Sequence, residues 1–394
     1  MGATSAVADT TVKWDTAKLD DLLEQARINV LLVSSRHNLR HLLDGYQYFL
    51  YRVGDPIGLS RYQPLLGYPR GRLDIAFYVG AGNERWGVEA EPLWVPDLIN
   101  GAWSSEDAAI TAAAELRRRG YETATVGVEL SFLAGDALRA LERELPGARF
   151  VDAASLLEEL RAVKRADELE HVRAAAEGIV ASMLTTFSCV RVGMTKREIV
   201  ERFRSELTSR GLTFEYCLVA AGKDLNRAPS SYRLPEGGPL SLDSGGEAGG
   251  FIGDVARIAV VGEPTAELVE ALAAVDRVQQ AARSAIQPGR RGGDIFSVAE
   301  QALAQLSQQD RMGFLAHGMG RATHEVPRLT STGSPPYPAT HAERPLEPGM
   351  VISVETHLAD ARIGFVKLED VLIVTKDGHE AVADVARGWN LIGV

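Results

Sequence analysis

The sequence has 394 residues, of which 45% are hydrophobic and 24% charged, a composition typical of a globular protein. This length exceeds one ordinary domain and predicts two. The formal net charge of −11 argues against nucleic acid or an anionic membrane as the main partner. No apolar run approaches the roughly 18 residues of a membrane span, so no membrane partner is expected.

The N-terminus shows no basic region followed by an apolar stretch, and we expect no secretory signal peptide. Cys189 and Cys217 lie among apolar neighbours, without the spacing of a disulfide framework or a thiolate metal site. Two free thiols fit a reducing compartment, and a cytoplasmic protein is therefore expected.

The first part of the chain alternates helical and strand patterns. An amphipathic helix follows Asp15, and a buried strand covers Ile28–Val33. The segment Leu50–Arg72 is rich in proline and glycine and predicts an irregular loop. This alternation predicts an α/β domain. The further expected elements are strands at Leu73–Val79, Arg85–Glu89 and Ala124–Glu129, and helices at Glu106–Arg119 and Ala134–Glu144.

A strongly helical pattern then begins and continues through about Asp167–Val190, so we place a domain boundary after Val163. The two domains expected are residues 12–163 and 164–394. Thr195 and Glu198 form the pattern of a capping box, which predicts a helix to about Arg210. Strands and hairpins follow, together with two helices, which predicts an α+β domain. Those helices are expected at Ala266–Ile286 and Asp294–Gln308.

Two hairpins in this second domain carry acidic residues. Asp243 ends an apolar run, a glycine-rich loop spans Ser244–Gly250, and a second strand, Phe251–Val261, contains Asp254. A turn midway between the two aspartates would place them on facing positions. Facing side chains on paired strands have Cβ atoms roughly 5 Å apart, a spacing that suits carboxylates bridging ions.

The same construction occurs again. Strands at Met350–Glu355 and Gly364–Val374 flank a turn within Asp360–Ile363, so Glu355 should face Glu369. Facing like charges destabilise a sheet, and their recurrence indicates that cations lie among them.

His317 lies in a glycine-rich segment that lets a substrate or a strand approach closely. We assign it to the metal, and we assign His324, seven residues later, to the substrate carbonyl as an electrostatic stabiliser. Oxygen and imidazole ligands without thiolate favour Mn²⁺, Co²⁺, Fe²⁺ or Zn²⁺. Two such ions can bridge and deprotonate a water molecule, which predicts hydrolysis of an acyl bond. The expected ligands of the two divalent ions are Asp243, Asp254, His317, Glu355 and Glu369.

The order and spacing of these motifs resemble the pita-bread metallopeptidases (family M24), which include methionine aminopeptidase, aminopeptidase P, prolidase and creatinase. The segment Ser35–Tyr46 resembles the creatinase-type N-terminal domain. The resemblance implies a creatinase-like α/β domain followed by a pita-bread catalytic domain. It rests on Leu242–Gly245, Gly253–Arg257, His317–Gly320, His324–Pro327, Pro348–Met350, Val354–Glu355 and Leu368–Asp370.

The resemblance also implies roles for the acidic residues. Asp254 and Glu369 match residues that bridge two ions, Asp243 completes the shell of one ion, and His317 and Glu355 complete that of the other. Glu355 would also transfer the proton, which makes it the expected catalytic residue beside His324. Manganese is an expected metal, and because relatives are commonly dimers, a homodimer is expected.

Two positions depart from the family pattern. A histidine that contacts substrate in prolidase-like members corresponds to Ser231 here. The family arginine two residues before the last glutamate is Lys367, which cannot form the same bidentate contact. Hairpin register places His357 opposite Lys367. We expect Ser231, His324, Lys367 and His357 to contact the substrate.

The leading hypothesis is a metal-dependent hydrolase of a small amide, similar to Xaa-Pro dipeptidases and aminopeptidases, with a dipeptide or small-molecule substrate. The alternative is a non-peptide enzyme on the same scaffold that cleaves a C–N or C–S bond, similar to ectoine hydrolase or dimethylsulfoniopropionate lyase. A catalytically inactive binding protein is a third hypothesis, against which the intact ligand set argues. The chain contains no Gly-x-Ser-x-Gly elbow of a serine hydrolase.

Overall fold

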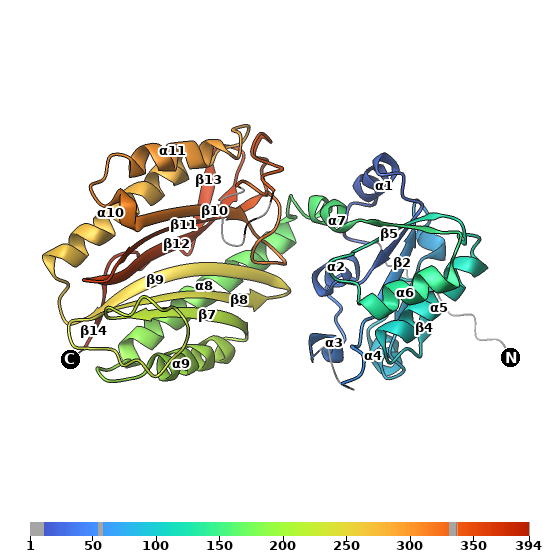
Figure 1. Ribbon diagram of the computed structural model, residues 1–394, viewed down its shortest axis with the longest axis horizontal. Coiled ribbons are helices and arrows are strands. Elements are labelled where there is room, and N and C mark those ends of the chain that lie inside the picture. The colour runs from blue at the N-terminus through green and yellow to red at the C-terminus, as the bar shows by residue number, and fades with distance from the viewer. Residues whose placement is uncertain (1–11, 54–57, 331–335, 337, 394) are drawn as a thin grey trace. The chain divides into compact units, whose positions relative to one another are not determined.

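The computed structural model describes residues 12–53, 58–330, 336 and 338–393, and it divides the chain into two compact units (Figure 1). The first unit ends at Leu160 and the second begins at Arg161. None of the helices in these described ranges is long and apolar enough to cross a membrane.

The first unit is built on a mixed sheet with the strand order β4-β3-β2-β1-β5-β6. Strands β5 and β6 run parallel to β1, whereas β2 is antiparallel to it. Its apolar residues lie in two clusters. The strands are β1 (Val30–Val33), β2 (Leu65–Pro69), β3 (Phe77–Gly80), β4 (Asp97–Asn100), β5 (Thr125–Val128) and β6 (Arg149–Asp152). The helices are α1 (Thr16–Gln25), α2 (Arg36–Leu42), α3 (Phe49–Val53), α4 (Glu84–Ala90), α5 (Ser105–Arg118), α6 (Gly135–Glu144) and α7 (Ala154–Leu160), with a 3₁₀ turn at Leu73–Ile75.

Two sequence predictions in this unit are wrong, and a third, the strand at Leu73–Val79, is wrong in its first part, because Leu73–Ile75 form a 3₁₀ turn and β3 begins at Phe77. The expected strand at Arg85–Glu89 is helix α4, in which the Glu84 carboxylate accepts a hydrogen bond from the Ala81 amide, 2.8 Å away. The expected loop at Leu50–Arg72 contains part of α3 and the buried strand β2. Strand β2 was not predicted because proline and glycine usually indicate a loop. Here Pro69 is the last residue of the strand, and Gly67 leaves room for the ring of Phe77 on the neighbouring strand.

The second unit contains a larger sheet, whose main path runs β10-β11-β12-β9-β8-β7, with β13 paired to β12 and β14 to β9. Helices α8 and α9 pack on β7–β9, and α10 and α11 pack on β10–β12 (Figure 1). The strands are β7 (Thr213–Ala221), β8 (Pro239–Ala248), β9 (Phe251–Val261), β10 (Met312–Gly318), β11 (Val351–Asp360), β12 (Gly364–Val374), β13 (His379–Val382) and β14 (Asn390–Ile392). The helices are α8 (Ala166–Cys189), α9 (Lys196–Ser209), α10 (Ala266–Ser284) and α11 (Asp294–Leu303), with a 3₁₀ turn at Gln309–Arg311.

The predicted start of α9 is confirmed: the Thr195 hydroxyl accepts a hydrogen bond from the Glu198 amide, and the Glu198 carboxylate accepts one from the Thr195 amide. The predicted loop Ser244–Gly250 is wrong in extent, because β8 continues to Ala248 and the turn consists only of Gly249 and Gly250. Both glycines have positive φ, a backbone conformation that tight hairpin turns require and that glycine adopts without strain.

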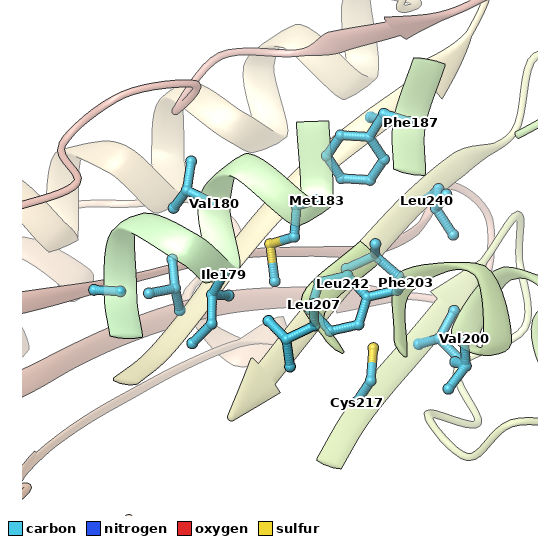
Figure 2. Packing of buried hydrophobic residues seen from close by; sticks show 14 of the residues in the cluster. Ile179, Val180, Met183, Phe187, Val200, Phe203, Leu207, Cys217, Leu240 and Leu242 are labelled. Carbon is cyan, nitrogen blue, oxygen red and sulfur yellow. The ribbon is translucent and has the colours of Figure 1, made fainter. Parts of the chain in front are cut away.

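The largest apolar cluster of this unit lies between helices α8 and α9 and the strands beneath them. Figure 2 shows Met183 and Phe187 of α8 beside Phe203 of α9, with Leu240 and Leu242 of β8. Successive side chains of a strand point to opposite faces of the sheet. Because Leu242 points toward these helices, its neighbour Asp243 points to the other face, where the candidate site lies.

Candidate metal centre

The first acidic hairpin has a register different from the one predicted. Asp243 pairs with Ala256, and Asp254 pairs with Gly245, so the two aspartates are diagonal neighbours rather than facing residues. The turn at Gly249 and Gly250 lies one residue later than the predicted midpoint. Because the shift is two positions in register, both side chains still point to the same face of the sheet.

The second acidic hairpin has the predicted register. Glu355 pairs with Glu369, and His357 pairs with Lys367. Glu369 also pairs with Ala256 on β9, and Ala256 pairs with Asp243 on β8. Asp243, Glu369 and Glu355 therefore lie in one row across neighbouring strands.

His317 reaches the same site from the end of β10. It pairs with Ser353, whose hydroxyl donates a hydrogen bond to the Glu369 carboxylate at 2.7 Å. The chain then folds back, because Gly318 forms a β-bridge with Glu325. This return stacks the His324 ring on the His317 ring, with centroids 3.8 Å apart and planes inclined by 13°.

The five predicted ligands are brought together as two groups that share Glu369. In each group, one ligand atom from every residue lies within 4.8 Å of the others. Asp254 Oδ1 and His317 Nε2 are buried and have no hydrogen-bond partner among the residues described. Buried polar atoms without partners are costly, and a divalent cation would satisfy both. The first group is Asp254, His317 and Glu369, and the second is Asp243, Glu355 and Glu369.

Lys367 lies within the second group. Its Nζ is 2.6 Å from Asp243 Oδ2 and 2.9 Å from Glu369 Oε2, and it also pairs with Glu355. The side chain is 3% exposed. Its ammonium therefore lies against the carboxylates, and Lys367 also lines the cavity above them, so its expected contact with substrate stays a prediction.

The charges of the site change the pKa values of its members. Burial raises the pKa of Asp254 well above its usual range, and the negative charge of Glu369 adds to this effect. Burial would also raise the pKa of Glu369, but Lys367, and then His317, lower it overall. Burial opposes the charged form of Lys367, yet Glu369 and Glu355 raise its pKa. The ammonium therefore stays charged at neutral pH.

A cavity of 280 Å³ opens over the acidic row. Its lining includes Tyr216, Arg227, Thr323 and His324, together with Lys367 and the four carboxylates of Asp243, Asp254, Glu355 and Glu369. Burial, together with the neighbouring His317, lowers the pKa of His324 to about 3, so the imidazole is neutral at pH 7.

Two expected substrate contacts do not line this cavity. Ser231 is exposed, and His357 stacks on the ring of Phe365, with centroids 5.2 Å apart. The sequence reasoning missed Arg227, which pairs with Asp243 and lies over the Phe365 ring, 5.0 Å from its centroid. It also missed Tyr216, which hydrogen-bonds Asp254. Tyr216 could have been considered from the sequence because it lies in an apolar run that has the pattern of a strand.

Comparison with known families identifies both units. The model of Metallopeptidase family M24 matches residues 170–376, just over half of the chain. The model of the Creatinase/Prolidase N-terminal domain matches residues 16–163. The chain therefore belongs to metallopeptidase family M24, a family of metal-dependent hydrolases, and the resemblance inferred from the sequence motifs is confirmed.

Individual relatives agree with this assignment. The chain is 26% identical over 309 residues to a protein named Xaa-Pro dipeptidase from Lactobacillus helveticus, covering 76% of this chain and 81% of the relative. Among solved structures, Xaa-Pro dipeptidase from Bacillus anthracis has a TM-score of 0.79 at 21% identity, covering 96% of this chain and 99% of that one. X-Pro aminopeptidase from Thermotoga maritima has a TM-score of 0.76 at 18% identity, covering 96% and 99%. These two likenesses establish the fold, as expected from the sequence.

Proposed function

We propose that this protein is a metal-dependent dipeptidase that hydrolyses the amide bond of Xaa-Pro dipeptides. The observation that carries the proposal is the buried group of Asp254, His317 and Glu369, of which Asp254 and Glu369 line the cavity. Two ligand atoms of this group have no hydrogen-bond partner within the part of the chain that the structure describes. The names of the sequence relatives favour this substrate class. The cavity, at 280 Å³, is slightly smaller than the roughly 300–1,000 Å³ of pockets for drug-sized ligands, which suits a dipeptide.

The residues present fit a divalent ion of the Mn²⁺, Co²⁺, Fe²⁺ or Zn²⁺ type, because they offer carboxylate oxygens and one imidazole nitrogen. Such an ion, when bound, polarises the carbonyl group and lowers the pKa of water. We also propose the cytoplasm as the location and a homodimer as the assembly, on the grounds given for the sequence.

The side chains around this group have distinct tasks in the proposed reaction. Glu355, which is 15% exposed, accepts a proton from the attacking water and transfers it to the departing proline nitrogen. Water contributes its hydroxyl to the carbonyl carbon as the C–N bond breaks. The neutral His324 donates a hydrogen bond to the carbonyl oxygen as negative charge develops there. Arg227 offers a positive charge to the free carboxylate of a dipeptide.

A second candidate is cleavage of a non-peptide C–N or C–S bond in a small charged molecule. It is favoured by Lys367 at the position of the family arginine and by Arg227 in the cavity wall. Lys367 keeps the positive charge of the family arginine without its bidentate geometry, and Arg227 adds a positive charge to the cavity wall.

An assay on a small panel distinguishes the two candidates. The protein is stripped with a chelator, reloaded with Mn²⁺, Co²⁺, Fe²⁺ or Zn²⁺, and incubated with alanylproline, alanylprolylglycine, ectoine and dimethylsulfoniopropionate. We expect free proline from alanylproline only after reloading. Turnover of ectoine or dimethylsulfoniopropionate without turnover of alanylproline would support the second candidate, and full turnover by stripped protein would contradict both.

Replacing His324 tests its proposed part in the reaction. His324→Ala should lower kcat by about 100- to 1,000-fold, because one stabilising donor to the developing oxyanion is lost. KM and the amount of bound metal should change little, since His324 belongs to neither ligand group. Steady-state kinetics with alanylproline, together with metal analysis, measure both quantities. An unchanged kcat would remove His324 from the mechanism.

A further inference from the structure

Lys367 places a positive charge at a position where a metal ion was expected. Its Nζ contacts Asp243, Glu355 and Glu369. These are the same three residues that make up the second of the two possible metal-binding groups. The ammonium therefore already fills the position between those carboxylates.

An ammonium and a divalent ion cannot both occupy this position. Carboxylate oxygens coordinate such ions at roughly 2.0–2.2 Å. An ion bound to Asp243, Glu355 and Glu369 would therefore lie within about 3 Å of Nζ of Lys367. Two cations at that distance repel each other strongly in a buried site. Lys367 would have to leave the carboxylates, and it is buried with its ammonium in contact with all three.

The formal charges of the site lead to the same conclusion. Metal ligands bind in their deprotonated form, so with metal bound the four carboxylates (Asp243, Asp254, Glu355 and Glu369) count as −4, and Lys367 with Arg227 counts as +2. His317 as a neutral ligand adds nothing. The sum of −4 and +2 is −2, which a single divalent ion neutralises. The two buried ligand atoms without partners, on Asp254 and His317, belong to the first group alone.

We propose that the Lys367 ammonium replaces one metal ion of the expected pair, so that this protein binds a single divalent ion through Asp254, His317 and Glu369. This inference rests on the proposed metal-dependent function and replaces its expected two-ion centre with a mononuclear one. Asp243 is then neutralised by Lys367 and Arg227 rather than by metal.

Metal stoichiometry tests this inference without reference to activity. Wild-type protein, Lys367→Met and Arg227→Met are stripped, dialysed against excess Mn²⁺, freed of unbound metal and analysed by mass spectrometry of metals. We expect one ion per chain in the wild type and two in Lys367→Met, because removal of the ammonium leaves three facing carboxylates without a shared cation. Arg227→Met is the matched control, and it should stay at one ion because Lys367 remains in place.

The outcomes separate the inference from the function on which it rests. Two ions per chain in the wild type would overturn the inference and leave a metal-dependent dipeptidase intact. One ion in both the wild type and a folded Lys367→Met would overturn the role given to Lys367. No bound ion in any of the proteins would overturn the metal-dependent function as well. Electron paramagnetic resonance of the Mn²⁺-loaded wild type keeps the test decisive if Lys367→Met does not fold: an uncoupled ion supports the inference, and an exchange-coupled pair overturns it.

Discussion

Glu369→Gln should abolish both metal binding and hydrolysis. Glu369 is the residue shared by the two ligand groups, and it is 1% exposed. A carboxamide has neither the charge nor the basicity of a carboxylate. Since changes to residues that only support metal ligands cost about 10- to 100-fold in affinity, loss of this ligand should weaken Mn²⁺ binding by more than about 100-fold. Isothermal titration with Mn²⁺ measures the affinity, and release of proline from alanylproline measures the activity.

The exposed Glu300 provides a matched control, because Glu300→Gln makes the same chemical change away from the site. That variant should bind Mn²⁺ like the wild type. Circular dichroism establishes that both variants are folded. A folded Glu369→Gln protein that binds Mn²⁺ with wild-type affinity would remove Glu369 from the metal centre.

Glu325→Gln should destabilise the second unit by about 3 kcal/mol. Glu325 is buried between two cations: Arg161 Nη2 lies 3.0 Å from one carboxylate oxygen, and Lys164 Nζ lies 2.9 Å from the other. Removing one partner of a buried ion pair leaves uncompensated charge, here two cations, and costs several kcal/mol. For a domain of this size, the melting temperature should fall by roughly 10 °C. Thermal unfolding followed by circular dichroism at pH 7 gives both quantities.

The same ion pairs predict a pH dependence. Burial alone would raise the pKa of Glu325, but Lys164 and Arg161 lower it to about 2 from an ordinary value of 4.5. A carboxyl group whose pKa is lower in the folded state stabilises that state above its unfolded pKa. This stabilisation is lost as the pH falls from 4.5 toward 2. The difference in unfolding free energy between wild type and Glu325→Gln should therefore shrink over that range.

Glu201 serves as the control for this prediction, since its ion pair with Arg204 is on the surface, with side chains 58% and 50% exposed. Exposed pairs contribute about 1 kcal/mol or less, so Glu201→Gln should melt close to the wild type. Equal effects of Glu201→Gln and Glu325→Gln would contradict the importance of burial. Because Glu325 also forms the bridge with Gly318 that returns the chain to His324, its loss should reduce activity too.

The fold was predictable where local chemistry determined the structure. The capping box at Thr195 and the hairpin that pairs Glu355 with Glu369 follow from short motifs, and both are confirmed. Strand β2 was missed because its proline and glycine residues look like a loop, and only its neighbours β1 and β3 make it a strand. Helix α4 was missed because its short sequence lacks a clear helical period.

The residues of the candidate site could be predicted from the sequence, but their positions relative to one another could be predicted only in part. The five proposed ligands lie together. Asp243 and Asp254 are diagonal neighbours, however, because the turn at Gly249 and Gly250 lies one residue later than the midpoint between the two aspartates. The contacts of Lys367 and Arg227 depend on the conformations of two long side chains, and the spacing of residues in the sequence does not determine these conformations. Ser231 was expected at the site by counting from a motif, and it lies outside the cavity lining.

The most direct test of the metal centre is a crystal structure of the Mn²⁺-loaded protein with anomalous scattering measured for manganese. We expect an anomalous peak within coordination distance of the carboxylate oxygens of Asp254 and Glu369 and of Nε2 of His317. Loaded crystals with no anomalous peak among these three residues would contradict it.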